Sequence, residues 1–440
     1  MSDMEALLDL ALMPARAIPE SARRMARFSL FDWIVCGRAG RSEPLSGALC
    51  ALAAAESGAQ EAAIFGGGRY PARLAALVNG AVSHALDYDD THFAHVGHPS
   101  VGIYPAALAA GELSNASAAA VADAFLIGAE ASVRIGLTLG PAHYNRGFHQ
   151  TATAGAFGAT IAAGRLLGLD REAMRVALGL AATRASGLKS QFGTMGKPYN
   201  AGIAASNGVE CARLAALGFT SADDGIYGPQ GFLPTHTDKE GAGAWDAPPP
   251  ETFLFEDVKY KLHACCHGTH AMIEALAGAA DSVGHPVRAA DVRSLHLRTS
   301  PRWLKVCDIK QPRTGLEVKF SYNWLAGMVF EGISTASDRA YADALAGDGR
   351  LAAFARKVTV SGDDAIGDMQ ADCRLELEDG TVLHLVHDLS LRLPDQRIEL
   401  ALREKARGLI GTEGDGIWAA VAGLDGISAR VLATCLGGKA

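Results

Sequence analysis

Small apolar residues at helical spacing dominate roughly the first 220 residues of this 440-residue chain. Alanine, leucine and glycine recur there with the period that places apolar side chains on one face of a helix, most clearly over 118–137, 154–167 and 173–185. Asp170 precedes the last of these runs and suits an N-cap. Because small side chains let helices approach closely, the sequence predicts a tightly packed all-helical domain.

Length and charge narrow the class of protein. A chain of 440 residues exceeds the size that one hydrophobic core usually supports, so we expect two domains. Hydrophobic residues make up 49% and charged residues 20%, which is typical of globular proteins and argues against disorder. The net charge of -8 gives no basic surface for nucleic acid, so an anionic substrate must be held by local cations.

The sequence predicts a cytoplasmic protein without a membrane span. The N-terminal residues lack the basic start and apolar stretch of a secretory signal. The apolar run 121–139 is interrupted by Asp123, Glu130 and Arg134, so it falls short of about 20 uninterrupted apolar residues. The eight cysteines form no CxxC pair, which favours reduced thiols over a disulfide or zinc framework.

The pattern changes after the glycine- and proline-rich stretch 225–250, which reads as a long connection. Alternating or β-branched residues then predict strands at 292–297, 357–361, 373–377 and 382–388, with a hairpin turn at 378–380 between the last two. Helices starting near His270 and Tyr322 are expected to cover this sheet, and helical spacing returns from Asp395 onward. The fold class is therefore mainly α, with a smaller α+β domain.

The candidate chemistry is concentrated in the segment HALDYDDTH at 84–92, followed by His95 and by HPS at 98–100. It gathers three carboxylates and four imidazoles, the groups whose pKa values burial and mutual proximity move toward neutrality. General acid–base catalysis is one interpretation, and a solvated loop with a helix cap is the other.

A metal site is a further interpretation, because His92, His95 and His98 recur at three-residue intervals. Gly97 and Pro99 make one continuous helix through all three imidazoles unfavourable, so the three need not share a face. We therefore expect a site without a metal.

These motifs resemble the MmgE/PrpD family, which contains 2-methylcitrate dehydratases, cis-aconitate decarboxylases and iminodisuccinate epimerases. Besides HALDYDDTH and HPS, similar motifs follow in the same order over most of the chain: NG at 79–80, GFH at 147–149 with Thr151, GTM at 193–195 with KP at 197–198, and KFS at 319–321. One departure is Tyr199-Asn200, where many relatives have a hydrophobic residue and a histidine.

The resemblance implies a fold in which the C-terminal helices return to the helical domain. Domain boundaries are then 1–255 with 396–440 for the helical domain and 256–395 for the inserted α+β domain. It also implies a homodimer that acts on a small di- or tricarboxylate. No Rossmann fingerprint, serine elbow or iron–sulfur cysteine cluster is present in the sequence, so no cofactor is expected.

Three functions remain open at this point. The first is a lyase, of dehydratase or decarboxylase type, that abstracts a proton next to a carboxylate. The second is an epimerase or isomerase of an amino- or imino-dicarboxylate, and the third is an inactive relative that only binds carboxylates. The first two share a carbanion-like intermediate and need a base, cationic stabilisers and an acid.

The resemblance and the local sequence together nominate nine site residues. Proton transfer and carboxylate binding are assigned to a first group, with Tyr144 as a second proton donor: His98, His149, Lys197 and Tyr144. Substrate binding is assigned to a second group: Asp87, Thr91, His267, Arg313 and Lys319. Four of these residues have a simpler interpretation. His149 could be a helix-capping histidine, His267 could be part of a polar helix N-terminus, and Arg313 and Lys319 could be ordinary surface cations.

Overall fold

The computed structural model describes residues 2–437, which form two compact units. Unit 1 contains the chain up to Tyr260 and again from Thr412 onward, and unit 2 is Lys261–Gly411. The expected fold class, mainly α with a small sheet-containing part, is confirmed. Helix α17 (Asp395–Ile410), which the sequence analysis assigned to the helical domain, groups with unit 2.

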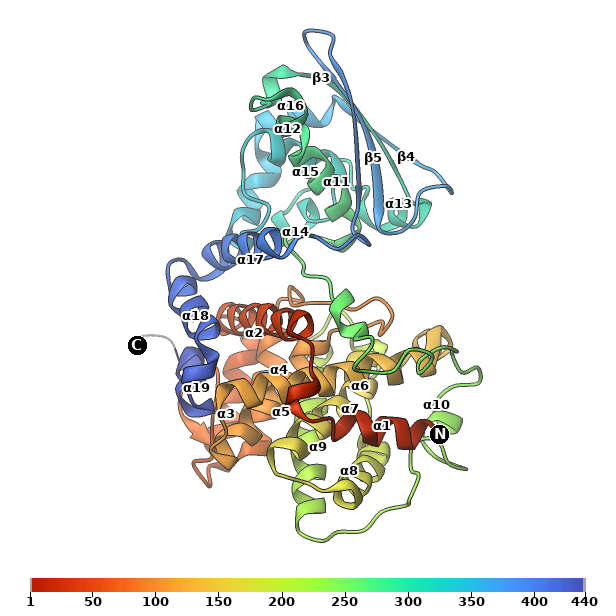
Figure 1. Cartoon of the computed structure of the whole chain (residues 1–440). Coiled ribbons are helices and arrows are strands. Elements are labelled where there is room, and N and C mark those ends of the chain that lie inside the picture. The colour runs from red at the N-terminus through yellow and green to blue at the C-terminus, as the bar shows by residue number, and fades with distance from the viewer. Residues whose placement is uncertain (1, 438–440) are drawn as a thin grey trace. The chain divides into compact units, whose positions relative to one another are not determined.

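The centre of unit 1 is a layer of buried helices packed against one another (Figure 1). These are α4 (Ala72–Ser83), α5 (Pro99–Ser114), α6 (Ala118–Arg146), α7 (Gln150–Leu166) and α9 (Gly196–Ala216). Around them lie α1 (Asp3–Ala11), α2 (Glu20–Gly40), α3 (Pro44–Glu56), α8 (Arg171–Arg184), α10 (Phe232–His236), α18 (Glu413–Ala422), α19 (Ala429–Gly437) and the short strands β1 (Ala62–Ala63) and β2 (Arg69–Tyr70). Almost every residue of α5 and α7 is buried, and many of these residues are alanine or glycine.

The three helical runs predicted in this region are confirmed as α6, α7 and α8. Helix α6 extends past the predicted end to Arg146, across a kink at Gly140 (φ 63°) that is followed by Pro141. The side chain of Asp170 accepts a hydrogen bond from the backbone N–H of Ala173, so it caps α8 as predicted.

Helices α6 and α7 cross at two glycines. A Cβ atom at Gly128 would lie 2.3 Å from the carbonyl oxygen of Gly158, and one at Gly158 would lie 2.5 Å from the carbonyl oxygen of Gly128. The two backbones are therefore in direct contact at this point. Any larger side chain has to push the helices apart.

Unit 2 is built on a four-stranded sheet in the order β4-β3-β5-β6. The strands are β3 (Val292–Thr299), β4 (Val358–Gly362), β5 (Gln370–Leu377) and β6 (Val382–Asp388). Strands β3 and β4 are parallel and the other pairs antiparallel. The four predicted strands and the turn at 378–380 are confirmed, and Gly380 supplies the positive φ (90°) that the turn needs.

Helices accompany this sheet as expected from the sequence. Helix α11 (His270–Ala277) packs on β5 and β6, and α15 (Tyr322–Phe330) packs on α11 and near β4 (Figure 1). Helix α12 (Ala279–Val283) precedes β3. The long connection between β3 and β4 contains α15 and also α13 (Pro301–Cys307), α14 (Gly315–Val318) and α16 (Gly349–Ala355). Among the described residues, no helix is both long and apolar enough to cross a membrane.

A histidine joins two segments of unit 2. His263 Nε2 lies 2.8 Å from Glu274 Oε1 on α11, and His263 Nδ1 lies 2.8 Å from Thr335 Oγ1. Burial raises the pKa of Glu274, but the hydrogen bond with His263 and the charges of His263, His387 and Arg397 together outweigh burial and leave that pKa below its ordinary value. The ionised carboxylate therefore contributes to the stability of unit 2.

We expect Gly128→Ala to lower the free energy of unfolding by about 1–3 kcal/mol, because the added methyl group has no space between α6 and α7. The matched control is Gly416→Ala on exposed α18, where a Cβ meets nothing within 4 Å. The control is expected to stabilise by about 0.5–1 kcal/mol through helix propensity alone. Denaturant unfolding measures both, and equal effects of the two substitutions would contradict the close-packing argument.

We expect Glu274→Gln to make unfolding less pH-dependent in the acid range. Since the folded-state pKa of Glu274 is depressed, its contribution to stability is present above the unfolded pKa and disappears as pH falls through the folded pKa. The difference in melting temperature between wild type and variant should shrink as pH falls from about 5 to about 3. Exposed Glu56→Gln serves as the control and should show no such trend.

Candidate functional site

Four helix ends of unit 1 carry the side chains of the candidate site. His84 follows the C-terminus of α4, His98 is the N-cap of α5, His149 is the N-cap of α7, and Lys197 lies in the first turn of α9. The imidazole rings of His84 and His98 are 4.6 Å apart, and those of His84 and His149 are 6.1 Å apart, between centroids. Three helix N-termini thus meet at one place, where the positive ends of their helix dipoles favour an anion.

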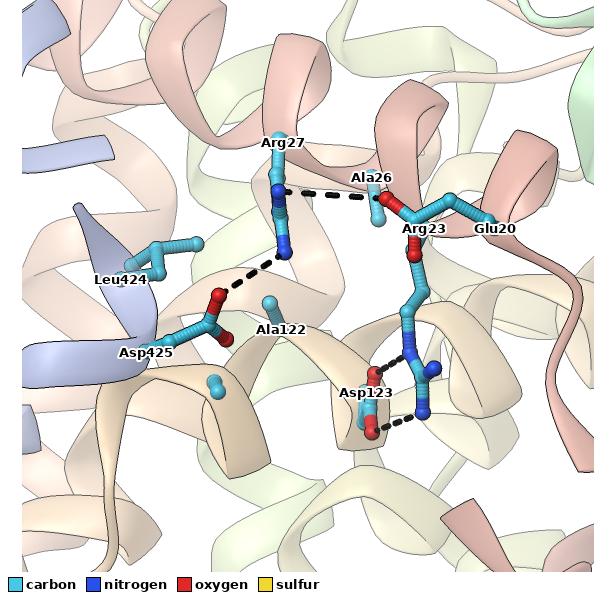
Figure 2. Close-up of a pocket in the computed structure, with 9 residues that line it drawn as sticks. Glu20, Arg23, Ala26, Arg27, Ala122, Asp123, Leu424 and Asp425 are labelled. Atoms are coloured by element: carbon cyan, nitrogen blue, oxygen red, sulfur yellow. Dashed lines mark hydrogen bonds and ion pairs between the residues drawn. The ribbon is translucent and has the colours of Figure 1, made fainter. Parts of the chain in front are cut away.

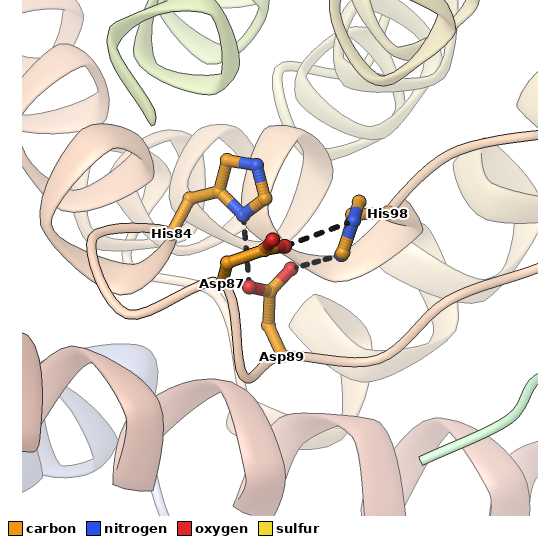
Figure 3. Close-up of side chains that lie close together, drawn as sticks. All are labelled: His84, Asp87, Asp89 and His98. Carbon is orange, nitrogen blue, oxygen red and sulfur yellow. Dashed lines mark hydrogen bonds and ion pairs between the residues drawn. The ribbon is translucent and has the colours of Figure 1, made fainter. Parts of the chain in front are cut away.

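A buried carboxylate joins two of these histidines (Figure 3). Asp89 Oδ1 lies 2.8 Å from His84 Nδ1, and Asp89 Oδ2 lies 2.8 Å from His98 Nδ1. The other nitrogen of His98, Nε2, lies 3.4 Å from Asp87 Oδ1. Asp89 is fully buried, whereas the side chain of Asp87 is 48% exposed. Nδ1 of His98 therefore faces the buried Asp89, and Nε2 faces the open side of the site, where Asp87 is half-exposed.

Burial and neighbouring charge set the protonation of this cluster. Burial by itself raises the pKa of Asp89, but the imidazoles of His84 and His98 hold that pKa well below its ordinary value. Burial lowers the pKa of His98 to about 4, although Asp89 partly opposes the shift. At neutral pH the cluster therefore contains an ionised carboxylate beside a neutral imidazole.

Lys197 is a cation at this site. Its Nζ lies 2.7 Å from Asp87 Oδ2 and 5.3 Å from the ring centroid of Phe192. The Lys197 side chain is mostly buried, at 16% exposed. Its ion-pair partner Asp87 is half-exposed, so this cation is accessible to a competing carboxylate.

Asn200 on α9 fixes the hydrogen bonding of His149. Its Nδ2 lies 3.2 Å from His149 Nδ1 and 3.3 Å from the carbonyl oxygen of Leu188. Since the carbonyl can only accept, Nδ2 is the donor, and His149 Nδ1 accepts from it. Burial, together with His84, His98 and Lys197, lowers the pKa of His149 to about 2. His149 is therefore neutral, with its proton on Nε2.

Asp90 holds the loop that carries His98. Its carboxylate accepts from the backbone N–H of Ser100 (3.2 Å) and from the hydroxyls of Ser100 (2.6 Å) and Ser29 (2.8 Å). Burial and the nearby Asp32 raise the pKa of Asp90 to about 7. Asp87, at the tip of the loop, has a positive φ of 51°, a conformation that costs energy and often marks functional segments.

The structure thus brings together four of the nine residues nominated from the sequence: Asp87, His98, His149 and Lys197. Sequence reasoning named His84, Asp89 and Asn200 only as members of motifs. The first two are within HALDYDDTH, and Asn200 is the departure from the family pattern. Asn200 could have been found from its position three residues after Lys197, because this spacing places two side chains next to each other on a helix.

Tyr144 and Thr91 contact other parts of unit 1. Tyr144 is in the last turns of α6, and Lys189 Nζ lies 3.5 Å from its ring centroid. Thr91 pairs with Lys259 through backbone hydrogen bonds, and its hydroxyl lies 3.4 Å from the Lys259 carbonyl oxygen. Their assignments to proton donation and substrate binding stay predictions.

The other three nominated residues are in unit 2. The ring of His267 stacks on that of His270, with centroids 4.8 Å apart. Arg313 is exposed and pairs with Glu317 at 2.9 Å, and Lys319 forms an ion pair with Asp338. Their roles in substrate binding also stay predictions.

The histidine triplet considered as a metal site does not provide three ligands. His92 Nε2 lies 2.7 Å from the carbonyl oxygen of Leu254, and among the described residues His92, His95 and His98 do not form a group with metal-ligand spacing. A different set has its donor atoms within 4.8 Å of one another and could hold a metal ion: His84, Asp87, Asp89 and His98.

A cavity of about 340 Å³ between α2, the start of α6 and the segment before α19 is less suited to an anion (Figure 2). Arg23 is held by both carboxylate oxygens of Asp123, at 2.9 and 3.0 Å. Arg27 pairs with Asp425 at 3.5 Å and with Glu20 at 3.9 Å. Both guanidinium groups are therefore already paired, and carboxylates outnumber them in this cavity.

Comparison with known protein families agrees with this geometry. The MmgE/PrpD N-terminal domain matches residues 10–243, and the MmgE/PrpD C-terminal domain matches residues 263–392. The chain belongs to the MmgE/PrpD family. The first of these matches contains every helix end that carries the site, and the second lies within unit 2.

Curated members of the MmgE/PrpD family resemble part of this chain. The cis-aconitate decarboxylase-like protein oryM of Aspergillus oryzae is 32% identical over 59% of this chain and 57% of its own length. The cis-aconitate decarboxylase of Aspergillus terreus is 30% identical over 64% and 61%, and that of Homo sapiens is 34% identical over 34% and 32%. The chain thus spans under two thirds of the length of these relatives.

We expect Asn200→Asp to raise the pKa of His149 by about 1–3, because a carboxylate beside the ring favours its charged form. The control is Asn207→Asp on the same helix, where the side chain contacts Arg184 rather than His149. Histidine-selective NMR titration measures the shift. An unchanged His149 titration in Asn200→Asp would contradict the contact between these two side chains.

Proposed function

We propose that this protein is a cofactor-independent lyase that removes a proton from the carbon next to a carboxylate of a small di- or tricarboxylate. The observation that carries the proposal is the meeting of Lys197 and three helix N-termini with the Asp89–His98 pair. This arrangement combines an anion-binding environment with a buried proton acceptor, which are the two requirements of such a reaction.

The substrate is bound by Lys197 and the helix N-termini of the site. A substrate carboxylate competes with half-exposed Asp87 for Lys197, and the dipoles at the N-termini of α5, α7 and α9 stabilise its negative charge. His149 contributes a neutral N–H donor at Nε2, because Asn200 occupies its Nδ1. The predicted contacts of Thr91, His267, Arg313 and Lys319 belong to the same proposal.

Proton transfer uses His98. The C–H proton moves to His98 Nε2, the nitrogen on the open side, and the electron pair moves onto the adjacent substrate carboxylate. Asp89, 2.8 Å from Nδ1, stabilises the imidazolium that forms, and Lys197 stabilises the negative charge on the substrate. The intermediate then loses hydroxide, which takes a proton from His149 or Tyr144 and leaves as water. Alternatively, His98 returns its proton to another carbon of the intermediate, a carboxylate leaves as carbon dioxide, and the electron pair that it leaves behind takes a proton from His149 or Tyr144.

Decarboxylation of a cis-aconitate-like tricarboxylate is the reaction we favour between these two outcomes. Support comes from the relatives, which are named cis-aconitate decarboxylase or cis-aconitate decarboxylase-like protein. Epimerisation of an imino-dicarboxylate, suggested by the sequence around Tyr144, and loss of activity are outcomes of the same test. The homodimer and the cytoplasmic location stay predictions.

The test is incubation of the chelator-treated protein with citrate-like and aspartate-like acids in deuterated water, followed by proton NMR. We expect a new alkene and, for decarboxylation, release of carbon dioxide without added cofactor. Deuterium at an α-carbon without a new product identifies the epimerase instead. Absence of both exchange and product, with the acids nevertheless bound, contradicts an enzymatic role.

We expect Lys197→Ala and His98→Asn each to reduce turnover by roughly 100-fold or more, since each removes a group used in proton transfer or charge stabilisation. Exposed Lys239→Ala is the control and should retain wild-type rates. Circular dichroism establishes that the variants are folded. Near-normal rates in either folded variant would refute its assigned role.

A further inference from the structure

Two thiols of unit 2 that are about 40 residues apart in the sequence form a hydrogen-bonded pair. Cys266 directly precedes the 3₁₀ helix His267–Thr269, and Cys307 is the last residue of α13. The side chains of Cys266 and Cys307 hydrogen-bond to each other, and both are thiols in this structure. The reaction proposed above uses neither of them.

Helix α13 packs directly on the turn that follows Cys266. Trp303 is four residues before Cys307 on α13, so the two side chains share one face of this helix. A Cβ atom at Gly268 would lie 2.4 Å from the ring of Trp303. The face of α13 that carries Cys307 therefore lies against the chain next to Cys266.

One further segment contacts the backbone beside both cysteines. The backbone N–H of Cys266 donates to the carbonyl oxygen of Lys319 at 3.0 Å. Asp308, the residue after Cys307, forms a β-bridge with Ser321. Backbone contacts therefore hold the two cysteines near each other, so their pairing does not depend on side-chain orientation alone.

The two thiols differ in exposure and in hydrogen-bonding role. Cys307 is fully buried, whereas Cys266 is partly exposed. The hydrogen bond with Cys266 and burial together hold the pKa of Cys307 above its ordinary value, so Cys307 keeps its proton and donates it to the sulfur of Cys266. An accessible sulfur with a second thiol beside it is the arrangement of a redox-sensitive cysteine and its resolving partner.

We propose that hydroperoxides oxidise Cys266 and that Cys307 converts the product to a Cys266–Cys307 disulfide. The Cys266 thiolate attacks one peroxide oxygen and becomes a sulfenic acid, while the other oxygen takes the proton that Cys266 lost and leaves as water or an alcohol. The sulfur of Cys307 then attacks the sulfur of Cys266, and the departing hydroxide takes the Cys307 proton and leaves as water. Two thiols thus lose two electrons and two protons, and the peroxide is reduced.

The disulfide changes a segment that carries two predicted substrate contacts. His267 directly follows Cys266, and the carbonyl oxygen of Lys319 accepts the backbone hydrogen bond of Cys266. Replacing the hydrogen bond between the two sulfur atoms by a shorter covalent bond moves this backbone. We therefore expect oxidation to lower turnover, an effect that rests on the lyase function proposed above, whereas formation of the disulfide does not.

The experiment treats the reduced, full-length protein with hydrogen peroxide, followed by thiol titration after denaturation and by peptide mass spectrometry. We expect the loss of two of the eight thiols per chain and a cross-link between the peptides that contain Cys266 and Cys307. Cys266→Ser and Cys307→Ser should each abolish the cross-link. The matched control is Cys265→Ser, because a serine hydroxyl can keep the contact of this neighbouring side chain with Thr269, and it should form the cross-link as the wild type does.

The proposal is overturned if no cross-link forms, if the cross-link persists in Cys266→Ser, or if peroxide converts Cys266 only to a sulfinic acid. Should the buried Cys307→Ser fail to fold, Cys266→Ser decides alone, because its side chain is partly exposed.

Turnover of the cross-linked protein should fall by about 10-fold or more and recover with dithiothreitol, because a displacement of about 1 Å at a substrate contact lowers rates strongly. Unchanged turnover in cross-linked protein would overturn the effect on the site. Absence of lyase activity before oxidation would overturn the proposed function, while the cross-link would still establish the disulfide.

Discussion

The close contact between small-residue helices is the constraint on which the rest of unit 1 depends. A Cβ atom at Gly202 of α9 would lie 2.3 Å from the carbonyl oxygen of Leu77 on α4. At Gly80 of α4, a Cβ atom would lie 2.9 Å from Gly202. Helices packed backbone to backbone leave their ends in fixed relative positions. His84 at the end of α4 and Lys197 at the start of α9 are thereby held in one site.

Buried charge is tolerated at this site because each group has a defined partner. Asp89 is stabilised by His84 and His98, and Asp90 by three hydrogen bonds from serine groups. These contacts hold the loop between α4 and α5 in one conformation, including the positive φ of Asp87. The same arrangement leaves Lys197 and one face of His98 accessible, which is what a carboxylate substrate requires.

Gly97 connects this loop to helix α7. A Cβ atom there would lie 2.8 Å from the backbone nitrogen of Thr151, so only glycine allows the loop to lie against the start of α7. Next to it, the backbone N–H of His98 donates to Thr151 Oγ1 at 3.0 Å. The HPS and GFH motifs, about 50 residues apart in the sequence, are therefore in direct contact in the fold. This contact places His98 and His149 in the same site.

The sequence by itself determined the fold class, three helices of unit 1 (α6, α7 and α8) and the four strands of unit 2. Through its motifs it nominated Asp87, His98, His149 and Lys197 as candidate site residues. These follow from local periodicity, turn residues and motif resemblance, all of which are carried by neighbouring residues. Only the tertiary structure decided that Asn200 contacts His149 and that Asp89 lies between two imidazoles. It also decided that the possible metal-ligand set contains His84 and His98, and not His92 and His95 as the sequence spacing suggested. The physical reason is that these contacts depend on how helices from distant parts of the chain pack, which the spacing of residues within one segment does not specify.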